Sequence, residues 1–211
     1  MTTVLIADDH AVVAQGLSAL LKETFHIVGV VHDGRALIEA FQEQRPDVIL
    51  TDISMPGLNG IDAIRKILEQ QPEAKIVIVT MHDDSHLAAQ AFRLGVSGYV
   101  LKTSPKEELI KAIQEVSQGR AYLSPQVARG FIDVLLEGKI KLPASAGTLT
   151  GRQREVLQLL AEGKTMKEIA GILHISPRTV ESHKYEMMQN LGVTTTAELV
   201  QHAIRLKLVG G

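Results

Sequence analysis

Short apolar runs alternate with amphipathic stretches along the first 120 residues of the chain. Each apolar run is brief and rich in β-branched residues, as expected of a strand that is buried on both faces. Because a stretch with apolar residues at helical spacing follows each run, the strands are predicted to pair in parallel. The sequence therefore predicts an α/β domain over residues 1–120, built on a doubly wound five-stranded parallel sheet. Its strands are predicted at VLIA (4–7), IVGVV (27–31), DVILT (47–51), KIVIVT (75–80) and GYVL (98–101).

Residues 121–148 have the pattern of a linker that contains one helix. The helix is predicted over Pro125–Glu137, and GKIKLPASAG (138–147) has the Gly, Pro, Ser and Ala content of a connecting segment. This segment therefore marks a boundary between two domains.

Residues 149–211 are helical in pattern throughout, which predicts a small all-α domain of four helices. Each helix begins at a recognisable signal. Capping boxes start at Thr150, Thr165 and Thr195, and Ser176-Pro177 supplies an N-cap and a first-turn proline. A similar signal, Ser104-Pro105 with Glu107, predicts the start of the last helix of the first domain.

The net charge of −2 conceals an asymmetry between the two parts of the chain. Residues 1–140 carry 13 Lys and Arg against 18 Asp and Glu, a balance of −5, whereas residues 141–211 carry 9 against 6, a balance of +3. An acidic first part and a basic second part favour two modules with different partners.

The composition limits the possible site chemistry and the cellular compartment of the protein. The chain has no cysteine, which excludes disulfides, thiolate metal sites and cysteine nucleophiles and is consistent with a reducing cytosol. Its longest apolar run, Ile76–Val79, is far shorter than the ~20 residues that span a bilayer, and its N-terminus lacks a basic leader. We therefore expect a cytoplasmic protein that is not inserted in a membrane.

Polar side chains follow four of the predicted strands. Asp8 and Asp9 come after the first strand and Asp52 after the third, while Thr80 closes the fourth and Lys102 follows the fifth. The carboxyl ends of parallel strands share one edge of the sheet, where ligands bind. We therefore expect these side chains to converge.

Three carboxylates at one edge repel each other unless a cation lies among them, and an all-oxygen ligand set favours Mg²⁺. Lys102 and Thr80 are then suited to bind the oxygens of a neighbouring anion, for which phosphate is the obvious choice. Asp52 at such an edge is a candidate carboxylate nucleophile that forms an aspartyl phosphate.

A single Asp at a strand end is more often a helix cap or a turn residue than a ligand. Four polar placements after four different strands reverse that preference and favour a site. The run His82-Asp83-Asp84-Ser85-His86 has metal-binding residue types, but no distant ligand accompanies it, and we interpret it as a solvated loop.

The combination of Asp8-Asp9, Asp52-Ile53-Ser54-Met55-Pro56-Gly57, Thr80 and Lys102-Thr103-Ser104-Pro105 resembles the receiver domain of two-component response regulators, which has a flavodoxin-like fold. The resemblance implies that Asp52 accepts a phosphoryl group from a sensor histidine kinase. It also implies a metal site and a switch. Mg²⁺ would be bound by Asp9, Asp52 and the backbone carbonyl of Ser54, and Asp8 would act on it mainly through a metal-bound water. Thr80 and Lys102 would bind the phosphoryl oxygens, and Tyr99 matches the rotating aromatic residue.

One position departs from the receiver pattern. The residue after Thr80 is often very small in receivers, and here it is Met81. Its bulk is expected to restrict access to Asp52 and so to affect the rates of phosphorylation and hydrolysis.

Residues 165–191 read as a helix, a tight turn and a second helix. The outward positions of the second helix form a polar, partly basic face near a helix N-terminus, which suits phosphate contacts and base readout in a major groove. An ordinary helical hairpin with solvated charges is the alternative. Aromatic residues make up only 3% of the chain, which disfavours recognition of RNA or single strands by base stacking.

The segment LTGRQREVLQLLAEGKTMKEIAGILHISPRTVESHKYEMMQNLGV (149–193) resembles the LuxR-type helix-turn-helix that follows receivers in NarL/FixJ-type transcription factors. The resemblance implies that Pro177–Leu191 is the recognition helix and that the last helix, Thr195–Lys207, is the element through which such modules pair on DNA. Within that helix, Val200 and Ile204 are apolar residues four apart on one face, and they are predicted to make the pairing contact. The implied DNA contacts are Arg178, Thr179, Glu181, Ser182, Lys184 and Tyr185.

The sequence thus predicts a transcriptional regulator of a two-component phosphorelay. It would bind double-stranded DNA as a homodimer when phosphorylated, and would catalyse only its own phosphorylation and dephosphorylation. One alternative is a phosphatase or phosphotransferase with Asp52 as nucleophile. Such phosphatases commonly carry a second Asp two residues later, where this chain has Ser54. Another alternative keeps DNA binding but makes the receiver independent of phosphorylation.

Overall fold

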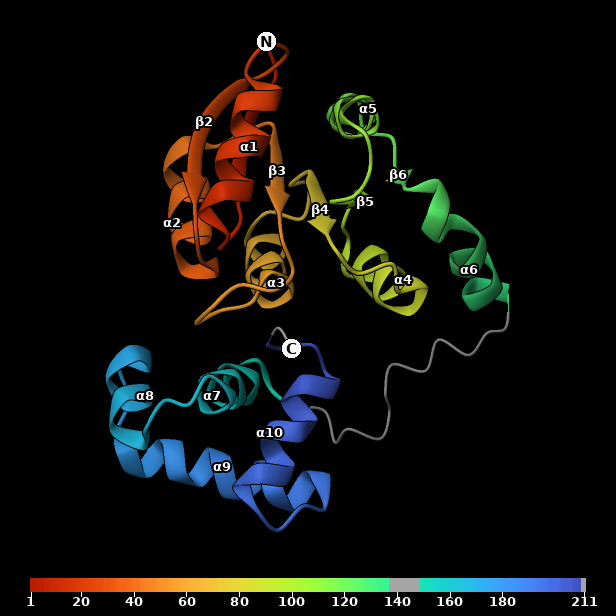
Figure 1. The fold of residues 1–211 in the computed structure, drawn as a ribbon. Coiled ribbons are helices and arrows are strands. Elements are labelled where there is room, and N and C mark those ends of the chain that lie inside the picture. Colours follow the sequence, from red (N-terminus) through yellow and green to blue (C-terminus); the bar gives the residue numbers. More distant parts are fainter. Residues whose placement is uncertain (137–148, 210–211) are drawn as a thin grey trace. The chain divides into compact units, whose positions relative to one another are not determined.

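The computed structural model describes residues 1–136 and 149–209, which fall into two compact units. The first unit holds all the described strands and helices α1–α6, and the second holds α7–α10 (Figure 1). The predicted connecting segment 138–147 lies outside the described residues. Among the described helices, none is both long and apolar enough to cross a bilayer.

The first unit is built on one parallel sheet with the strand order β2-β1-β3-β4-β5-β6. All five predicted strands are confirmed within about one residue, because buried parallel strands are continuous apolar runs that are easily read. A sixth strand of two residues is added at the edge. The strands are β1 (Thr3–Ala7), β2 (His26–Val31), β3 (Val48–Thr51), β4 (Ile76–Thr80), β5 (Gly98–Leu101) and β6 (Tyr122–Leu123).

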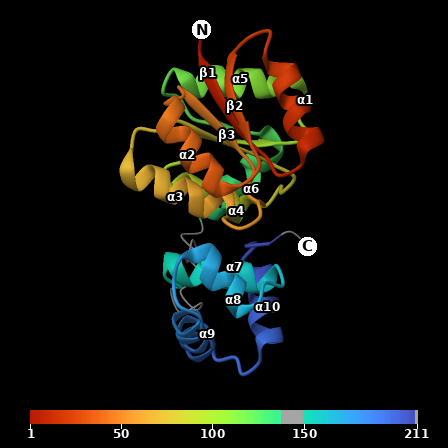
Figure 2. The same cartoon turned by 90° about the vertical axis from the view of Figure 1, so that its left-hand side faces the viewer.

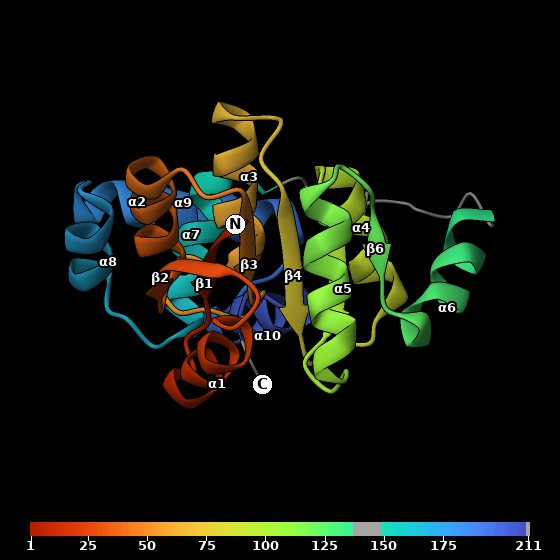
Figure 3. The same ribbon diagram turned by 90° about the horizontal axis from the view of Figure 1, so that it is seen from above.

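Helices cover both faces of this sheet, as the doubly wound fold requires. Helices α1 and α5 lie on one face, and α2, α3 and α4 lie on the other (Figures 2 and 3). On the α1 and α5 side, alternate sheet residues such as Ile6, Leu50 and Val79 pack with Leu21 and Ile113 in one core. The helices are α1 (Ala11–Leu21), α2 (Gly34–Gln44), α3 (Gly60–Gln70), α4 (Ser85–Leu94), α5 (Lys106–Ser117) and α6 (Pro125–Leu136).

Residues 121–136, which the sequence assigns to the linker, extend the first unit. Strand β6 pairs with β5, and the helix predicted over Pro125–Glu137 is observed as α6. Helix α6 packs on α4, where Phe92 and Phe131 make an edge-to-face contact with ring centroids 5.3 Å apart. Ser85 Oγ donates to the backbone carbonyl of Val127 over 3.3 Å, so the two helices are also joined by a polar contact.

The predicted start of α5 is wrong by one position. Pro105, not Ser104, is the N-cap residue, with an extended conformation (φ −65°, ψ 157°), and no side chain caps the helix. The Oγ of Ser104 instead lies 3.4 Å from the Oγ of the buried residue Ser124 and does not cap the helix.

The second unit is a bundle of four helices around one apolar core. All three predicted capping boxes are confirmed, at Thr150, Thr165 and Thr195, and Ser176 caps the helix that begins at Pro177. These caps explain why the helix starts were readable, since each satisfies backbone N–H groups that have no partner within the helix. The helices are α7 (Gly151–Ala161), α8 (Met166–Leu173), α9 (Pro177–Leu191) and α10 (Thr196–Arg205).

Candidate functional site

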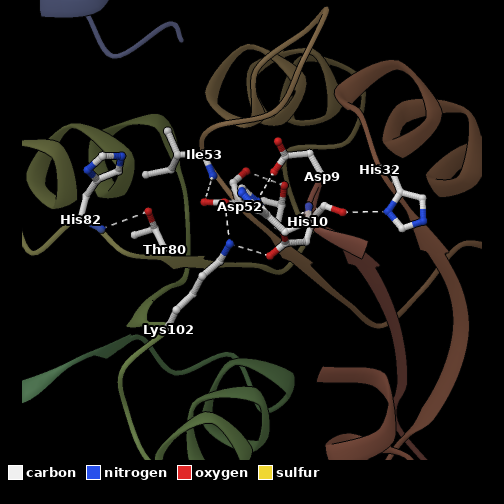
Figure 4. Close-up of polar contacts among 10 residues, drawn as sticks. Asp9, His10, His32, Asp52, Ile53, Thr80, His82 and Lys102 are labelled. Carbon is white, nitrogen blue, oxygen red and sulfur yellow. Dashed lines mark hydrogen bonds and ion pairs between the residues drawn. The ribbon is translucent and has the colours of Figure 1, made fainter. Parts of the chain in front are cut away.

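The sheet brings the predicted polar residues together at one edge. Asp8 and Asp9 follow β1, Asp52 follows β3, Thr80 ends β4 and Lys102 follows β5. These four strands are neighbours in the sheet and run in the same direction, so their carboxyl ends meet. Figure 4 shows the side chain of Lys102 reaching toward Asp52 from the end of β5, two strands away in the sheet.

Lys102 links two carboxylates. Its Nζ lies 2.6 Å from Asp8 Oδ2 and donates to Asp52 Oδ2 over 2.7 Å. Burial acts to lower the pKa of Lys102, but the hydrogen bonds to Asp52 and Asp8 and their charges outweigh it, so the pKa is raised. The ammonium group is therefore a fixed positive charge at the centre of the site.

The backbone around Asp52 is held in place by a close approach of α3. The backbone N–H of Ile53 donates to Asp52 Oδ1 over 2.6 Å, and the N–H of Gly60 donates to the Ile53 carbonyl over 2.8 Å. A Cβ atom at Gly60 would lie 1.9 Å from the backbone oxygen of Asp52. Only glycine fits there, so the first residue of α3 fixes the position of the candidate nucleophile.

Thr80 and Tyr99 are connected through the backbone of His82. Thr80 Oγ1 accepts from the His82 N–H over 3.3 Å, and the Tyr99 hydroxyl donates to the His82 carbonyl over 2.7 Å. Tyr99 is fully buried. Burial, with the charges of Asp84, Asp83 and Asp52, raises the pKa of Tyr99, so the hydroxyl group keeps its proton and remains a donor.

His10 is a member of the site that the sequence did not single out. Ligand atoms of Asp8, Asp9, His10 and Asp52 all lie within 4.8 Å of one another. The imidazole Nδ1 of His10 lies 2.8 Å from Asp9 Oδ1 (Figure 4). The available signal was its position directly after the Asp8-Asp9 pair. In addition, the ring of His32 is hydrogen-bonded through Nδ1 to the Asp8 carbonyl over 2.8 Å.

The first unit also contains three other features that the sequence analysis singled out: Met81, Ser54 and the loop before α4. The side chain of Met81 is 65% exposed and Ser54 is half-buried two residues after Asp52. Within the loop before α4, Asp84 caps the helix by accepting from the N–H groups of His86 and Leu87. That loop does not belong to the group of possible metal ligands found among the described residues.

Helix α9 presents the predicted polar face. Val180 and Met187 are buried in the core of the second unit, whereas most of the predicted DNA contacts are exposed. Five of these residues are exposed and one is half-buried: the exposed residues are Arg178, Thr179, Glu181, Ser182 and Tyr185, and the half-buried one is Lys184. The hydroxyl groups of two of them already have partners in the helix or its cap: Thr179 Oγ1 lies 2.8 Å from Ser176 Oγ, and Ser182 Oγ donates to the Arg178 carbonyl over 3.1 Å.

Helix α10 has a buried side, and two of its apolar residues are only partly buried or exposed. Leu199 and Ala203 are buried in the core, while Val200 is half-buried and Ile204 is exposed. Val200 and Ile204 are four residues apart and so lie on the same face of the helix. The two predicted dimerisation residues are therefore more exposed than the core residues of the same helix.

Both units match known protein families. Residues 4–114 match the response regulator receiver domain, and residues 147–203 match the bacterial regulatory proteins of the luxR family. The chain is a two-component response regulator. Its family consists of transcription regulators.

Individual relatives span the regulator almost from end to end. The oxygen regulatory protein NreC of Staphylococcus carnosus (strain TM300) is 37% identical over 213 residues, covering 98% of each chain. Among solved structures, the response regulator RcsB in complex with DNA is 29% identical with a TM-score of 0.61, covering 98% of this regulator and 99% of that chain. A structure of two RcsB dimers bound to two parallel DNAs is 30% identical with a TM-score of 0.60, covering 98% and 99%.

The order of the two matches agrees with the organisation of the regulator. The receiver match falls within the α/β unit that carries Asp52, and the luxR match falls on the helical unit that carries α9. The regulator therefore combines a receiver with a LuxR-type DNA-binding domain and acts in the regulation of transcription.

Proposed function

We propose that Asp52 is the residue through which this regulator receives its signal, by accepting a phosphoryl group from a phosphohistidine of a sensor histidine kinase. An oxygen of the Asp52 carboxylate forms the new bond to phosphorus as the bond to the donor imidazole breaks. The observation that carries this proposal is the ion pair of Asp52 with Lys102, which provides a buried positive charge where phosphoryl oxygens arrive.

A Mg²⁺ ion fits the same site. Asp8, Asp9 and Asp52 supply converging carboxylate oxygens, and the carbonyl of Ser54 is proposed as a further oxygen ligand. When bound, the ion supplies neutralisation of the charge on the transferring phosphoryl group.

The neighbouring residues are proposed to read the modification. Lys102 and the hydroxyl group of Thr80 would bind the phosphoryl oxygens. A move of Thr80 toward them would act on the His82 backbone, which Thr80 and Tyr99 share. The phosphoryl group would in this way bias an equilibrium between inactive and active receivers.

The proposal is tested by labelling the full chain with a small acyl phosphate and Mg²⁺. Asp52→Asn should abolish incorporation of a hydroxylamine-labile phosphoryl group, and EDTA should do the same to the wild type. Asp83→Asn, which removes an exposed carboxylate from the loop after β4, is the matched control and should be labelled normally. Equal labelling of Asp52→Asn would refute the assignment.

The regulator is proposed to catalyse only its own phosphorylation and dephosphorylation. In the same labelling experiment, Met81→Ala should change the rates of labelling and hydrolysis if the side chain screens Asp52. If the phosphorylated and unphosphorylated proteins bind DNA with the same affinity, this result would instead support the alternative that the receiver acts without phosphorylation.

The second unit is proposed to bind double-stranded DNA through α9. Its exposed face offers Arg178 and Thr179 near the helix N-terminus for phosphates, and Glu181, Ser182, Lys184 and Tyr185 for the major groove. The relationship to RcsB, which is described in complex with DNA, supports this role. Since DNA is the proposed ligand, the cytoplasm is the proposed site of action.

A homodimer is proposed as the active form. One recognition helix reads only a few base pairs, so specificity in a genome calls for two copies on paired half-sites. Val200 and Ile204 offer a small apolar face for this contact, and RcsB is described as binding DNA as dimers.

Gel-shift titrations with a two-half-site duplex test both proposals. Lys184→Ala should weaken binding and reduce its salt dependence, whereas Lys22→Ala, which removes the same charge from the end of α1, should not. Val200→Asp should abolish cooperative occupancy while leaving phosphorylation intact. Cooperative binding by Val200→Asp would show that this face does not mediate dimerisation.

A further inference from the structure

His10 adds a nitrogen donor to a site that otherwise offers only oxygen. Its Nδ1 lies 2.8 Å from Asp9 Oδ1 and 3.6 Å from Asp8 Oδ1. Two ligand atoms that bind one octahedral cation at about 2.1 Å, at right angles to each other, are about 3 Å apart. The imidazole and the two carboxylates are therefore spaced as ligands of a shared ion.

The ring is held near the carboxylates and remains accessible. The backbone N–H of His10 donates to Asp8 Oδ1 over 2.9 Å, which fixes the start of the side chain, while the side chain itself is 66% exposed. Asp8 is 1% exposed, and its Oδ2 forms an ion pair with Lys102 Nζ over 2.6 Å. The Asp8 carboxylate is therefore held at the centre of the site, with its Oδ1 facing the His10 ring.

We propose that His10 is a fourth metal ligand that shifts the preference of this site from Mg²⁺ toward first-row transition-metal ions such as Ni²⁺ and Co²⁺. The inference rests on the proposed metal site of the receiver. Mg²⁺ selects oxygen ligands, whereas imidazole nitrogen suits Ni²⁺, Cu²⁺ and Zn²⁺. One ring nitrogen therefore changes which ion is bound rather than whether an ion is bound.

A competing role for His10 is to orient Asp9 through the 2.8 Å contact, without binding metal. The two roles give different patterns. An orienting residue would affect Mg²⁺ and Ni²⁺ alike, and an amide side chain that donates to Asp9 would replace it. A ligand would affect Ni²⁺ selectively, and an amide would not replace it.

Isothermal titration calorimetry on the full chain, freed of any affinity tag, separates them. Mg²⁺ and Ni²⁺ are titrated into the wild type, His10→Ala, His10→Asn and His26→Ala. His26 is an exposed histidine at the start of β2, the amino end of the sheet, and serves as the matched control. We expect His10→Ala and His10→Asn each to lose about tenfold or more in Ni²⁺ affinity, with Mg²⁺ affinity changed by less than about threefold and His26→Ala unchanged.

Other outcomes overturn the inference. An equal loss for both ions, restored by His10→Asn, would make His10 an orienting residue, and an unchanged Ni²⁺ affinity in His10→Ala would exclude it as a ligand. The proposed magnesium site itself fails separately, if the wild type binds no Mg²⁺ or if Asp9→Asn and Asp52→Asn bind it as the wild type does.

Discussion

The hydroxyl group of Tyr99 donates a 2.7 Å hydrogen bond to the backbone carbonyl of His82, two residues beyond Thr80. Tyr99 is fully buried, so this aromatic residue is already turned inward in the structure. Its polar end is thus attached to the loop that would move when Thr80 engages a phosphoryl group.

Tyr99→Phe tests this link. The change leaves the ring in place but removes the donor to a partly buried carbonyl, which we expect to cost about 1 kcal/mol in the free energy of unfolding. It should also weaken the effect of phosphorylation on DNA binding. Urea denaturation and gel shifts with and without a phosphodonor measure the two effects. Tyr122→Phe, on the outer strand β6, is the control; an equal effect there would remove the special role of Tyr99.

Gly60→Ala is expected to disturb the phosphoacceptor. The new Cβ would lie 1.9 Å from the Asp52 backbone oxygen, so the loop must shift, at an expected cost of about 1 to 3 kcal/mol in stability. Labelling of Asp52 should slow as well. Gly16→Ala, within α1 and with no atom within 4 Å of the new Cβ, should instead stabilise the protein by about 0.5 to 1 kcal/mol. Normal labelling of Gly60→Ala would show that the contact does not position Asp52.

Gly130 and Ser85 should be coupled energetically. A Cβ on Gly130 would lie 2.3 Å from Ser85 Oγ, the atom that donates to Val127. Gly130→Ala should therefore lower the free energy of unfolding of the wild type. In the Ser85→Ala background the same change should leave that free energy unchanged or raise it. A double-mutant cycle by thermal or urea unfolding should give a coupling of about 1 kcal/mol. Additive effects would mean that α6 adjusts its position on α4.

His202 predicts a pH dependence of stability. Partial burial and the charge of Arg205, whose guanidinium lies 3.2 Å from His202 Nδ1, lower the pKa of His202 below 6.5. The folded state thus prefers the neutral ring. The resulting stabilisation is fully present above pH 6.5 and is lost as the pH falls through the lower folded pKa.

The difference in unfolding free energy between the wild type and His202→Gln, followed from pH 8 to pH 5, checks this sign. We expect the wild type to lose stability relative to the variant as the pH falls. A constant difference, or one that grows toward acid pH, would contradict it.

The sheet could be predicted from the sequence because each of its main strands is a continuous apolar run. Strand β6 could not, since two residues, Tyr122 and Leu123, carry no periodicity. The predicted start of α5 was wrong by one residue because the hydroxyl group of Ser104 lies beside that of Ser124, twenty residues away in the sequence, and does not cap the helix.

The candidate site could likewise be predicted only in part from the sequence. Asp8, Asp52 and Lys102 could be brought together from strand ends alone, because parallel topology places those ends at one edge. The position of His10 beside Asp9 depends on how one turn leaves β1, and a single histidine in a loop carries no pattern that distinguishes a ligand from a solvated side chain.

The pairing of β6 with β5 has a consequence for where the receiver can be cut or joined to other proteins. Ending a fragment at residue 120 would remove β6, the outer neighbour of β5, and uncover Phe92, leaving an open sheet edge that invites pairing with other chains. A fragment that ends at residue 136 keeps that edge covered. Chimaeric regulators that exchange one output domain for another should therefore be joined after α6, because a junction before β6 would leave the edge of β5 open to pairing with other chains.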